Sequence, residues 1–484
     1  MKLADFLIKR KQEKKAAIVE GNKEISYTEL YDRSSALSCI IQKQLKQRAH
    51  IAILLPNSIA YVLAYCSILL SGSVIVPIYY KSTTNEIENS VNYCDVSMII
   101  TDSDGEKRVI DSKLNHNVSV LNVHTLKLKS IGKLDTQATI HSPDCVSIML
   151  GTSGSTGSPK RVMLSDSNMI ENALGIIQSL KYQEDERLLV ALPMTFASGN
   201  TSQLVVSLIL GATLCLYQAP LHPKLFFESV KEYGATTTTI VPSVLKTLLA
   251  DDRDYSEHAK TLRVICFGGG PTDSGTFQKL LASPLRDKFV HMYGQMEAST
   301  RISHLHISKD KDKIPSVGQP LYNITVSVDI TDPATNTGEI YVKGDNVMVG
   351  YYKERNSPVS NGWLATGDIG YVDVHDYIYI TGRKKNIIIF SGMNIQPEEV
   401  EDVLCQNSEV AEALVYGEHD PQYGEVPVAE IVLKEPGAIT DAQLRCFCSE
   451  KLSHHKVPVR IYFVDALQRT FNGKVARKRS ESYA

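Results

Sequence analysis

The sequence has little that would direct the protein to a membrane, to nucleic acid or to an oxidising compartment. Its nine cysteines lack the paired spacing of a zinc site or of a secreted disulfide scaffold. A formal net charge of -3 argues against a general nucleic-acid binder. The N-terminal stretch has no uninterrupted apolar core and no small-residue cleavage site, so we do not expect a signal peptide. These absences predict a cytoplasmic protein with reduced thiols.

A continuous membrane-spanning run is also missing. The stretch 61–80 is long and apolar, but Ser67, Gly72, Ser73 and Pro77 interrupt it. A buried helix, a Ser-Gly turn and a core strand therefore explain this stretch better than a membrane helix does.

The order of apolar patterns along the chain predicts an α/β fold. A chain of 484 residues exceeds what one core usually holds, so two or three domains are expected. Before residue 145, helical patterns such as 60–70 alternate with apolar strands such as 51–55 and 74–78, and the alternation resumes with strands such as 188–192 and 263–267. This order predicts parallel sheets covered by helices, which bind ligands at strand ends.

The segment 149–165 has a composition that neither packing nor solubility explains. Seven consecutive residues, 151–157, are only Gly, Ser or Thr, and Pro159 and Lys160 follow. Glycines let backbone N–H groups converge on an anion, hydroxyls add donors and lysine adds charge, so a polyphosphate-binding loop is predicted. A flexible Ser/Gly linker is the alternative. A Walker-type loop is excluded, because its last Gly is followed directly by Lys and then Ser or Thr.

The run TSGSTGSPK resembles the phosphate loop of the adenylate-forming superfamily, which includes acyl-CoA synthetases, luciferases and the adenylation domains of peptide synthetases. The resemblance implies that the loop binds the β- and γ-phosphates of ATP through Thr152, Ser153, Gly154, Ser155, Thr156, Gly157 and Lys160. The family pattern continues with Gly after this lysine, whereas this chain has Arg161. We expect the bulk of Arg161 to stiffen or partly close the loop.

A second motif, HMYGQME at 291–297, resembles the family's Tyr-Gly-x-Thr-Glu. The resemblance implies that Tyr293 stacks on adenine. It also implies that Glu297, with Thr152, binds Mg²⁺, a hard cation suited to carboxylate and phosphate oxygens. Met296 replaces the Thr that normally contacts the α-phosphate, so one hydrogen-bond donor is lost.

Two later motifs complete the implied nucleotide site. Asp368 ends a Thr-Gly-Asp run similar to the family's ribose-binding motif, in which a carboxylate accepts both vicinal hydroxyls, although such a tripeptide alone is common in turns. The run 382–385 resembles the family's hinge, with Arg383 contacting the nucleotide and Lys385 at the pivot. The implied nucleotide site also includes Gly269, Gly270, Pro271, Met292, Gly294, Gln295 and Met296.

The turn 193–199 follows a predicted strand and matches the place where the family lines its acyl pocket. Phe196 would be a wall or gate of that pocket, although an aromatic residue after a strand is as often plain core. Amino-acid-activating relatives commonly carry Asp where this chain has Ala197. A buried unpaired ammonium is costly, so an aliphatic or aryl acid without further charge is expected rather than an α-amino acid. The implied pocket comprises Phe196, Ser198, Gly199, Gly268, Gly269 and Gln295.

The resemblance also implies how the chain is divided. A large N-terminal domain, 1–384, would contain the helix-covered sheets and a β-rich subdomain, and a small mobile α+β domain, 385–484, would rotate about Lys385. The run 467–474 is similar to the family's closing motif, whose lysine, here Lys474, bridges carboxylate and phosphate. A lone lysine in a basic tail is otherwise solvent-facing.

Together the motifs imply an AMP-forming carboxylate ligase that uses ATP and Mg²⁺ and passes the acyl group to CoA. Its implied catalytic residues are Lys474, Glu297, Thr152 and Lys160. Transfer to the phosphopantetheine of an acyl carrier protein is the alternative, since the basic run 474–479 suits CoA phosphates or an acidic carrier helix. A non-catalytic acyl-AMP-binding protein, suggested by Arg161 and Met296, is a hypothesis of another class.

Overall fold

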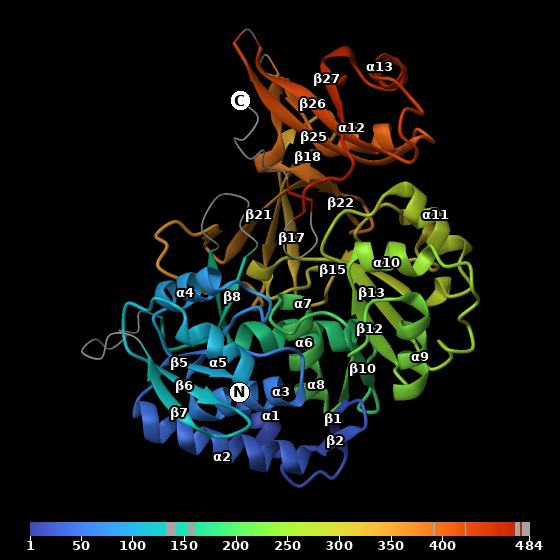
Figure 1. Cartoon of the computed structure of the whole chain (residues 1–484). Helices are drawn as coiled ribbons and strands as arrows, with labels where there is room; N and C mark the ends of the chain where they lie inside the picture. The colour runs from blue at the N-terminus through green and yellow to red at the C-terminus, as the bar shows by residue number, and fades with distance from the viewer. Residues whose placement is uncertain (132–141, 153–159, 391–392, 422, 470–474, 477–484) are drawn as a thin grey trace.

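The structure is a computed structural model. It describes residues 1–131, 142–152, 160–390, 393–421, 423–469 and 475–476. In Figure 1 the N-terminal two-thirds of the chain, blue to yellow-green, form a large helix-covered body, and the orange-red C-terminal part lies above it.

The first sheet is mainly parallel and runs in the order β16-β15-β14-β13-β12-β10-β11-β1-β2. Pairing is parallel from β1 through β11, β10, β12 and β13 to β14, and antiparallel at both margins. Its strands are β1 Ala16–Glu20, β2 Lys23–Ser26, β10 Arg187–Val190, β11 Thr213–Leu216, β12 Thr237–Ile240, β13 Val264–Gly268, β14 Phe289–Tyr293, β15 Ser303–His306 and β16 Gln319–Pro320. Parallel pairing brings the carboxyl ends of β10, β13 and β14 to one edge, where the predicted motifs follow.

The second sheet runs in the order β19-β9-β8-β4-β3-β5-β6-β7 and is parallel from β8 to β6. Its antiparallel margin, β8-β9-β19, carries the glycine-rich loop. Its strands are β3 His50–Leu54, β4 Val74–Pro77, β5 Val96–Thr101, β6 Val118–Asn122, β7 Leu128–Ile131, β8 Val146–Gly151, β9 Arg161–Ser165 and β19 Gly350–Tyr351. The predicted alternation of helices with parallel strands is confirmed in both sheets.

Helices cover both sheets of this large body (Figure 1). They are α1 Leu3–Lys9, α2 Tyr27–Leu45, α3 Ile59–Ser71, α4 Thr84–Tyr93, α5 Ser103–Ile110, α6 Asp166–Leu180, α7 Ala197–Gly199, the π-helix η1 Asn200–Val205, α8 Val206–Leu210, α9 Pro223–Tyr233, α10 Pro242–Leu249 and α11 Ser274–Ala282. One-turn 3₁₀-helices lie at η2 Arg286–Lys288, η3 Met296–Ala298, η4 Lys311–Lys313, η5 Lys384–Asn386 and η6 His454–Lys456.

Local sequence signals explain where these elements begin and end. Ser26 caps α2 in a reciprocal capping box with Glu29. Helix α3 ends at Gly72, whose φ of 75° is the left-handed conformation that glycine adopts without strain. The stretch 61–80 thus folds as the expected helix, turn and strand. Within the residues that the structure describes, no helix is both long and apolar enough to cross a membrane.

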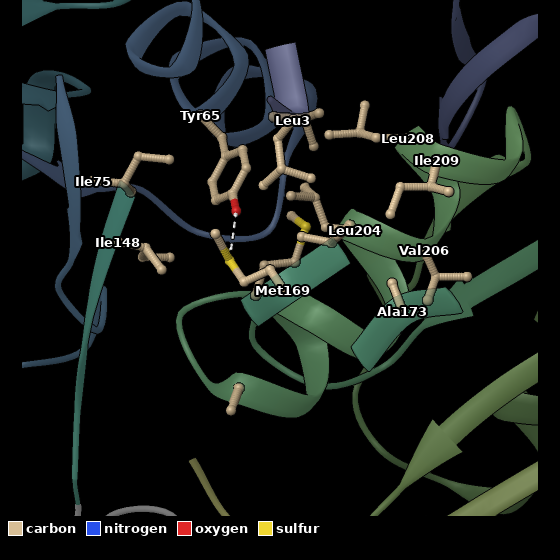
Figure 2. Packing of buried hydrophobic residues seen from close by; sticks show 14 of the residues in the cluster. Leu3, Tyr65, Ile75, Ile148, Met169, Ala173, Leu204, Val206, Leu208 and Ile209 are labelled. Carbon is tan, nitrogen blue, oxygen red and sulfur yellow. Dashed lines mark hydrogen bonds between the residues drawn. The ribbon is translucent and has the colours of Figure 1, made fainter. Parts of the chain in front are cut away.

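The main core includes residues of helices α1, α3, α6 and α8, several of which are drawn in Figure 2. Tyr65 of α3 is buried among Leu3, Ile75 and Leu204, and its hydroxyl reaches Sδ of Met169 on α6 at 4.0 Å. Helices α1, α3, α6 and α8 therefore form one apolar layer, which fixes the two sheets relative to one another.

The rest of the chain is β-rich and then α+β. The third sheet runs β17-β18-β21-β20, with β22 on β21, and the fourth runs β24-β23-β26-β25, with β27 on β26. Helices α12 Pro397–Cys405 and α13 Asp441–Ser449 pack on the fourth sheet around a separate core. The strands are β17 Thr325–Asp332, β18 Thr337–Lys343, β20 Val359–Ser360, β21 Trp363–Val372, β22 Ile378–Arg383, β23 Ile388–Phe390, β24 Met393–Ile395, β25 Val410–Asp420, β26 Gly424–Leu433 and β27 Arg460–Phe463.

The burial of His291 predicts acid sensitivity. It lies in β14 with its ring stacked 4.9 Å from that of Phe267, and burial lowers the pKa of His291 from 6.5 to about 4. Between these pH values the unfolded chain binds a proton that the native chain does not. The contribution of His291 to the free energy of unfolding is therefore fully present at neutral pH. It falls as the pH drops below 6.5, by up to ~1.4 kcal/mol per pH unit.

Urea unfolding of the wild type and of His291→Gln between pH 7 and pH 4.5 measures this effect. We expect the free energy of unfolding of His291→Gln to fall less steeply with decreasing pH. Parallel pH profiles for the two proteins would show that other groups cause the acid sensitivity.

Candidate nucleotide and acyl site

The glycine-rich loop joins two antiparallel strands, β8 and β9, whose register pairs Gly151 with Arg161. The described ends of the loop are tied together: Thr152 N donates to Lys160 O at 2.9 Å, and Lys160 N donates to Thr152 Oγ1 at 3.2 Å. The loop is therefore closed at its base. The predicted phosphate-binding residues Ser153, Gly154, Ser155, Thr156 and Gly157 lie outside the described residues.

Arg161, the departure from the family pattern, is buried at the base of this hairpin. Its Nη1 donates to the carbonyl of Pro77 at 3.3 Å, and the same atom would lie 3.1 Å from a Cβ added to Gly151. The side chain thus occupies the space that Gly151 leaves beside the end of β4. Its effect on the loop itself stays a prediction.

Tyr351 connects the predicted phosphate-binding lysine with the predicted metal-binding carboxylate. It lies on β19, which pairs with β9. Nζ of Lys160 lies 4.6 Å from the centre of the Tyr351 ring, and the Tyr351 hydroxyl donates to Glu297 Oε1 at 2.7 Å. Burial and then the Glu297 charge raise the pKa of Tyr351, so this hydroxyl stays protonated and remains a donor. Lys160 and Glu297, which are 137 residues apart in sequence, are brought into one site.

Asp368 is the centre of a second group. The Tyr293 hydroxyl donates to Asp368 Oδ2 at 2.6 Å, and Nε of Arg383 lies 2.6 Å from Oδ1. Burial raises the pKa of Asp368, while Arg383 and the Tyr293 bond oppose that rise. Burial, followed by the nearby Asp368 charge, raises the pKa of Tyr293 well above its usual value. The predicted adenine, ribose and hinge residues therefore form one hydrogen-bonded cluster.

The backbone passes so closely at Gly294 and Gly268 that neither position has room for a side chain. A Cβ on Gly294 would lie 1.9 Å from the carbonyl oxygen of Thr300, and a Cβ on Gly268 would lie 2.1 Å from that of Met292. Gly269 has φ +87°, which favours glycine. These contacts bring the predicted turn after β13 against the end of β14.

The predicted acyl segment lies beside the same strand end. Phe196 packs with Tyr79 at a ring separation of 5.4 Å, and Ala197 is buried with its carbonyl accepting from Thr300 Oγ1 at 3.0 Å. A Cβ on Gly199 would meet the Pro193 carbonyl at 2.4 Å, so this turn is also closely packed. Ser198 lies in the same short helix, α7.

The remaining predicted residues differ in their exposure. Met296 is partly buried against the main core, and Nε2 of Gln295 is buried without a hydrogen-bond partner in the described part of the chain. Gly269 and Pro271 are exposed at the turn after β13. Lys474 lies outside the described residues. The packing of Met296 accounts for an apolar side chain where the family has Thr.

A magnesium ion suits this arrangement because Mg²⁺ is usually held by one or two carboxylates together with substrate phosphates. Within the described ranges, no group of three or more His, Cys, Asp or Glu side chains could hold a metal by itself. Glu297 offers the single carboxylate, with its second oxygen not committed to Tyr351. The residues present therefore fit a metal that arrives with a nucleotide.

Sequence reasoning missed three residues at this site. Tyr351 lies in no recognised motif. Glu339 accepts from Gly367 N at 3.2 Å and pairs with Lys384 at 2.6 Å, which raises the pKa of that lysine. Arg301 follows the Tyr293–Glu297 motif by four residues and is fully buried. The sequence signal for Arg301 was a charged residue four positions after a predicted binding motif, whereas its burial is a property of the fold.

Comparison with known proteins decides the family. The AMP-binding enzyme family model matches residues 8–352, and the model of the AMP-binding enzyme C-terminal domain matches residues 399–474. The chain belongs to the AMP-binding enzyme family.

The AMP-binding enzyme is also similar to individual ligases over nearly its whole length. It is 32% identical to the 2-succinylbenzoate–CoA ligase of Bacillus velezensis over 98% of this chain and 97% of that protein. The structure of o-succinylbenzoate CoA synthetase from Bacillus subtilis with its acyl-adenylate intermediate has a TM-score of 0.82 at 28% identity, covering 98% of this chain and 96% of that one. The same synthetase with ATP and magnesium ion has a TM-score of 0.83 at 28% identity, covering 98% of each chain.

These similarities confirm the predicted superfamily, the α/β fold class and the class of enzyme, an AMP-forming acid–thiol ligase. The predicted ATP, Mg²⁺ and CoA agree with the names and bound groups of the related ligases. The hypothesis of a non-catalytic protein is set aside. The domain boundary at residue 384 and the roles of individual residues stay predictions.

Gly294→Ala tests the close approach at the predicted adenine site. The added Cβ meets backbone rather than a flexible side chain, so the end of β14 must shift. Because a displacement of ~1 Å can cost about 10²-fold in rate, we expect kcat/KM for ATP in pyrophosphate exchange to fall by about that factor.

The matched control is Gly275→Ala in α11, where the nearest neighbour is a side-chain oxygen of Asp273 at 3.3 Å. It should keep wild-type exchange and thermal stability. Equal kinetics in Gly294→Ala and Gly275→Ala would contradict the importance of this contact.

Proposed function

We propose that this AMP-binding enzyme activates an aryl or aliphatic carboxylic acid with MgATP to give acyl-AMP and pyrophosphate, and then transfers the acyl group to CoA. The observation that carries the proposal is the convergence of two groups: Lys160, Tyr351 and Glu297 on one side, and Tyr293 with Asp368 on the other. The first group suits phosphates with their metal, and the second suits adenosine. We also propose a cytoplasmic location, because the nine cysteines lack the paired spacing of a secreted disulfide scaffold.

The proposed adenylation needs no side-chain nucleophile. A carboxylate oxygen of the acid attacks the α-phosphorus, and pyrophosphate leaves with the electrons of the broken P–O bond. Glu297 would hold Mg²⁺, which would neutralise charge on the phosphates. The chain contributes alignment and positive charge: Lys160 and the loop hydroxyls hold the β- and γ-phosphates, and Lys474 holds the reacting oxygens.

The nucleoside would be held by the Asp368 cluster. Both oxygens of Asp368 already accept, from Tyr293 and from Arg383, so the carboxylate is fixed in orientation before a ribose arrives. A pre-oriented carboxylate accepts two vicinal hydroxyls without further loss of side-chain entropy. Tyr293 offers its ring to adenine from the end of β14.

In the proposed second step, the thiolate of CoA attacks the acyl carbonyl and AMP leaves. The relatives named as CoA ligases support CoA as the acceptor. They also support an aryl acid, since 2-succinylbenzoate contains a benzene ring. Phosphopantetheine on an acyl carrier protein remains the alternative acceptor, because it presents the same thiol.

The hinge proposal places the pivot at Lys385, in the one-turn helix η5 between β22 and β23. A side chain of one proposed domain comes close to the backbone of the other here: a Cβ on Gly382 would lie 3.0 Å from Glu398 Oε2 of α12, and Asn386 Nδ2 donates to Glu398 Oε1 at 2.9 Å within the proposed C-terminal domain. The approach across the boundary is therefore made by a polar α12 side chain rather than by an apolar core, which suits an interface that must open and close.

Pyrophosphate exchange over a panel of aliphatic, aryl and α-amino acids tests the proposed function. We expect exchange with an aryl or aliphatic acid, and we expect AMP release to require CoA in the full reaction. Exchange that is greatest with an α-amino acid would contradict the inference from Ala197. Thioester formation with a carrier protein but not with CoA would select the alternative acceptor.

Two lysine variants test the domain rotation. Lys474→Ala should reduce acyl-AMP formation by at least about 10²-fold, as expected for loss of a charged group at the reacting oxygens, while synthetic acyl-AMP is still converted to the thioester. Lys385→Pro should show the reverse pattern, because fixing φ restricts rotation more than it disturbs one pose. Equal losses of both half-reactions in both variants would exclude a domain rotation between adenylation and thioester formation.

A further inference from the structure

Arg301 is a buried cation to which the described residues offer no counter-ion. Its side chain is 1% exposed. Nη2 donates to Sδ of Met292 at 2.9 Å, but Nε and Nη1 have no hydrogen-bond partner within the described ranges. Arginine stays protonated in proteins, and an unpaired buried charge is costly. Two charged donors of Arg301 thus lack an acceptor among the described residues.

Arg10 is another buried arginine of this fold, and its guanidinium has protein partners. Its Nη1 pairs with Glu13 at 3.0 Å, and its Nη2 donates to the carbonyl of Ile209 at 3.0 Å. A carboxylate and a backbone oxygen therefore compensate Arg10. Arg301 has neither kind of partner for Nε and Nη1 among the described residues. We therefore look to a bound ligand for the missing acceptor.

The surroundings of Arg301 place it at the predicted acyl pocket. Thr300 Oγ1 bonds the carbonyl of Ala197, in the segment predicted to wall the pocket. Met292, the partner of Nη2, lies against Gly268, another predicted pocket residue. The backbone of Arg301 is fixed by Asn172 of α6, which both accepts from Arg301 N at 3.1 Å and donates to Arg301 O at 2.6 Å.

The backbone before Arg301 is strained in a way that fits a ligand site. Ser299 has φ 59°, and Thr300, a β-branched residue, has φ 129°. Such conformations persist only where the surroundings determine them, and they cluster at active sites. The Thr300 side-chain bond to Ala197 and the Thr300 N bond to Gln295 O at 3.1 Å hold this turn. The strained turn is thus held in place directly before Arg301.

We propose that Arg301 binds a second acidic group of the acyl substrate, a carboxylate remote from the one that is activated. The inference rests on the proposed function and narrows its substrate to a diacid. A guanidinium with two unused N–H groups matches a carboxylate in charge and in planar geometry. The sequence-based expectation of no further charge came from Ala197, which argues only against an ammonium. A cation at this site disfavours an ammonium as well and favours an anion.

Matched acids test the proposal through pyrophosphate exchange. One pair is 2-succinylbenzoate and 4-oxo-4-phenylbutanoate, the same acid without the ring carboxylate; aliphatic diacids and their half-esters form further pairs. We expect the wild type to favour the diacid of at least one pair by at least about 10²-fold in kcat/KM, because a monoacid leaves the buried charge unpaired. Arg301→Met should remove this preference, mainly through KM for the diacid, and Arg301→Lys should restore part of it.

The controls separate specificity from structure. Lys313→Met removes a positive charge that pairs with Asp373 at 2.7 Å and should leave the diacid preference unchanged. Thermal unfolding without substrate should show that Arg301→Met is as stable as the wild type or more so, since removing an unpaired buried charge costs no ion pair. Equal losses for diacid and monoacid in Arg301→Met, or a wild-type preference for monoacids, would overturn the proposal alone. Absence of exchange with every acid would instead overturn the proposed function on which it rests.

Discussion

The carboxylate of Asp368 is the group on which the arrangement of this site depends. It is 2% exposed, so its charge must be compensated within the protein. Tyr293, from the end of β14, and Arg383, from the end of β22, provide that compensation. Because the two partners come from different sheets, the cluster forms only when the first and third sheets dock correctly. The same contact that lowers the cost of burying Asp368 therefore assembles the proposed nucleoside site.

Tyr351 has the corresponding role at the proposed phosphate site. Its strand, β19, pairs with β9 at the margin of the second sheet, while its hydroxyl reaches Glu297 beyond the end of the first sheet. The aromatic face supports Lys160, and the hydroxyl orients the carboxylate. One side chain thus sets two charges of opposite sign at a fixed separation. A polyphosphate with its metal requires such a pair, because each partner alone would attract or repel the ligand without orienting it.

Much of this could be predicted from the sequence, for reasons that the structure makes plain. Parallel strands buried on both faces give apolar runs, so β3, β4 and β13 were recognisable from composition. Gly294 and Gly268 belong to recognisable motifs because backbone passes within about 2 Å of where a Cβ would be. Tyr351 could not be predicted in this way. Its role comes from the pairing of Tyr351 with Val162, 189 residues away in sequence, and pairing of that kind leaves no local pattern.

Arg301 shows where motif reasoning and physical reasoning diverge. The motif ends at Glu297, and the substitution of Asp by Ala197 made an uncharged pocket the natural expectation. The net charge of a pocket depends on every segment that lines it. Arg301, in the turn after Glu297, would therefore add a positive charge to the proposed pocket without altering any motif. The strained φ of Thr300, the bond from Thr300 to Ala197 and the unpaired donors of Arg301 are visible only in three dimensions. Selection of the acid would therefore depend on one buried charge and on the backbone that holds it, whereas the proposed adenylation chemistry would use other residues.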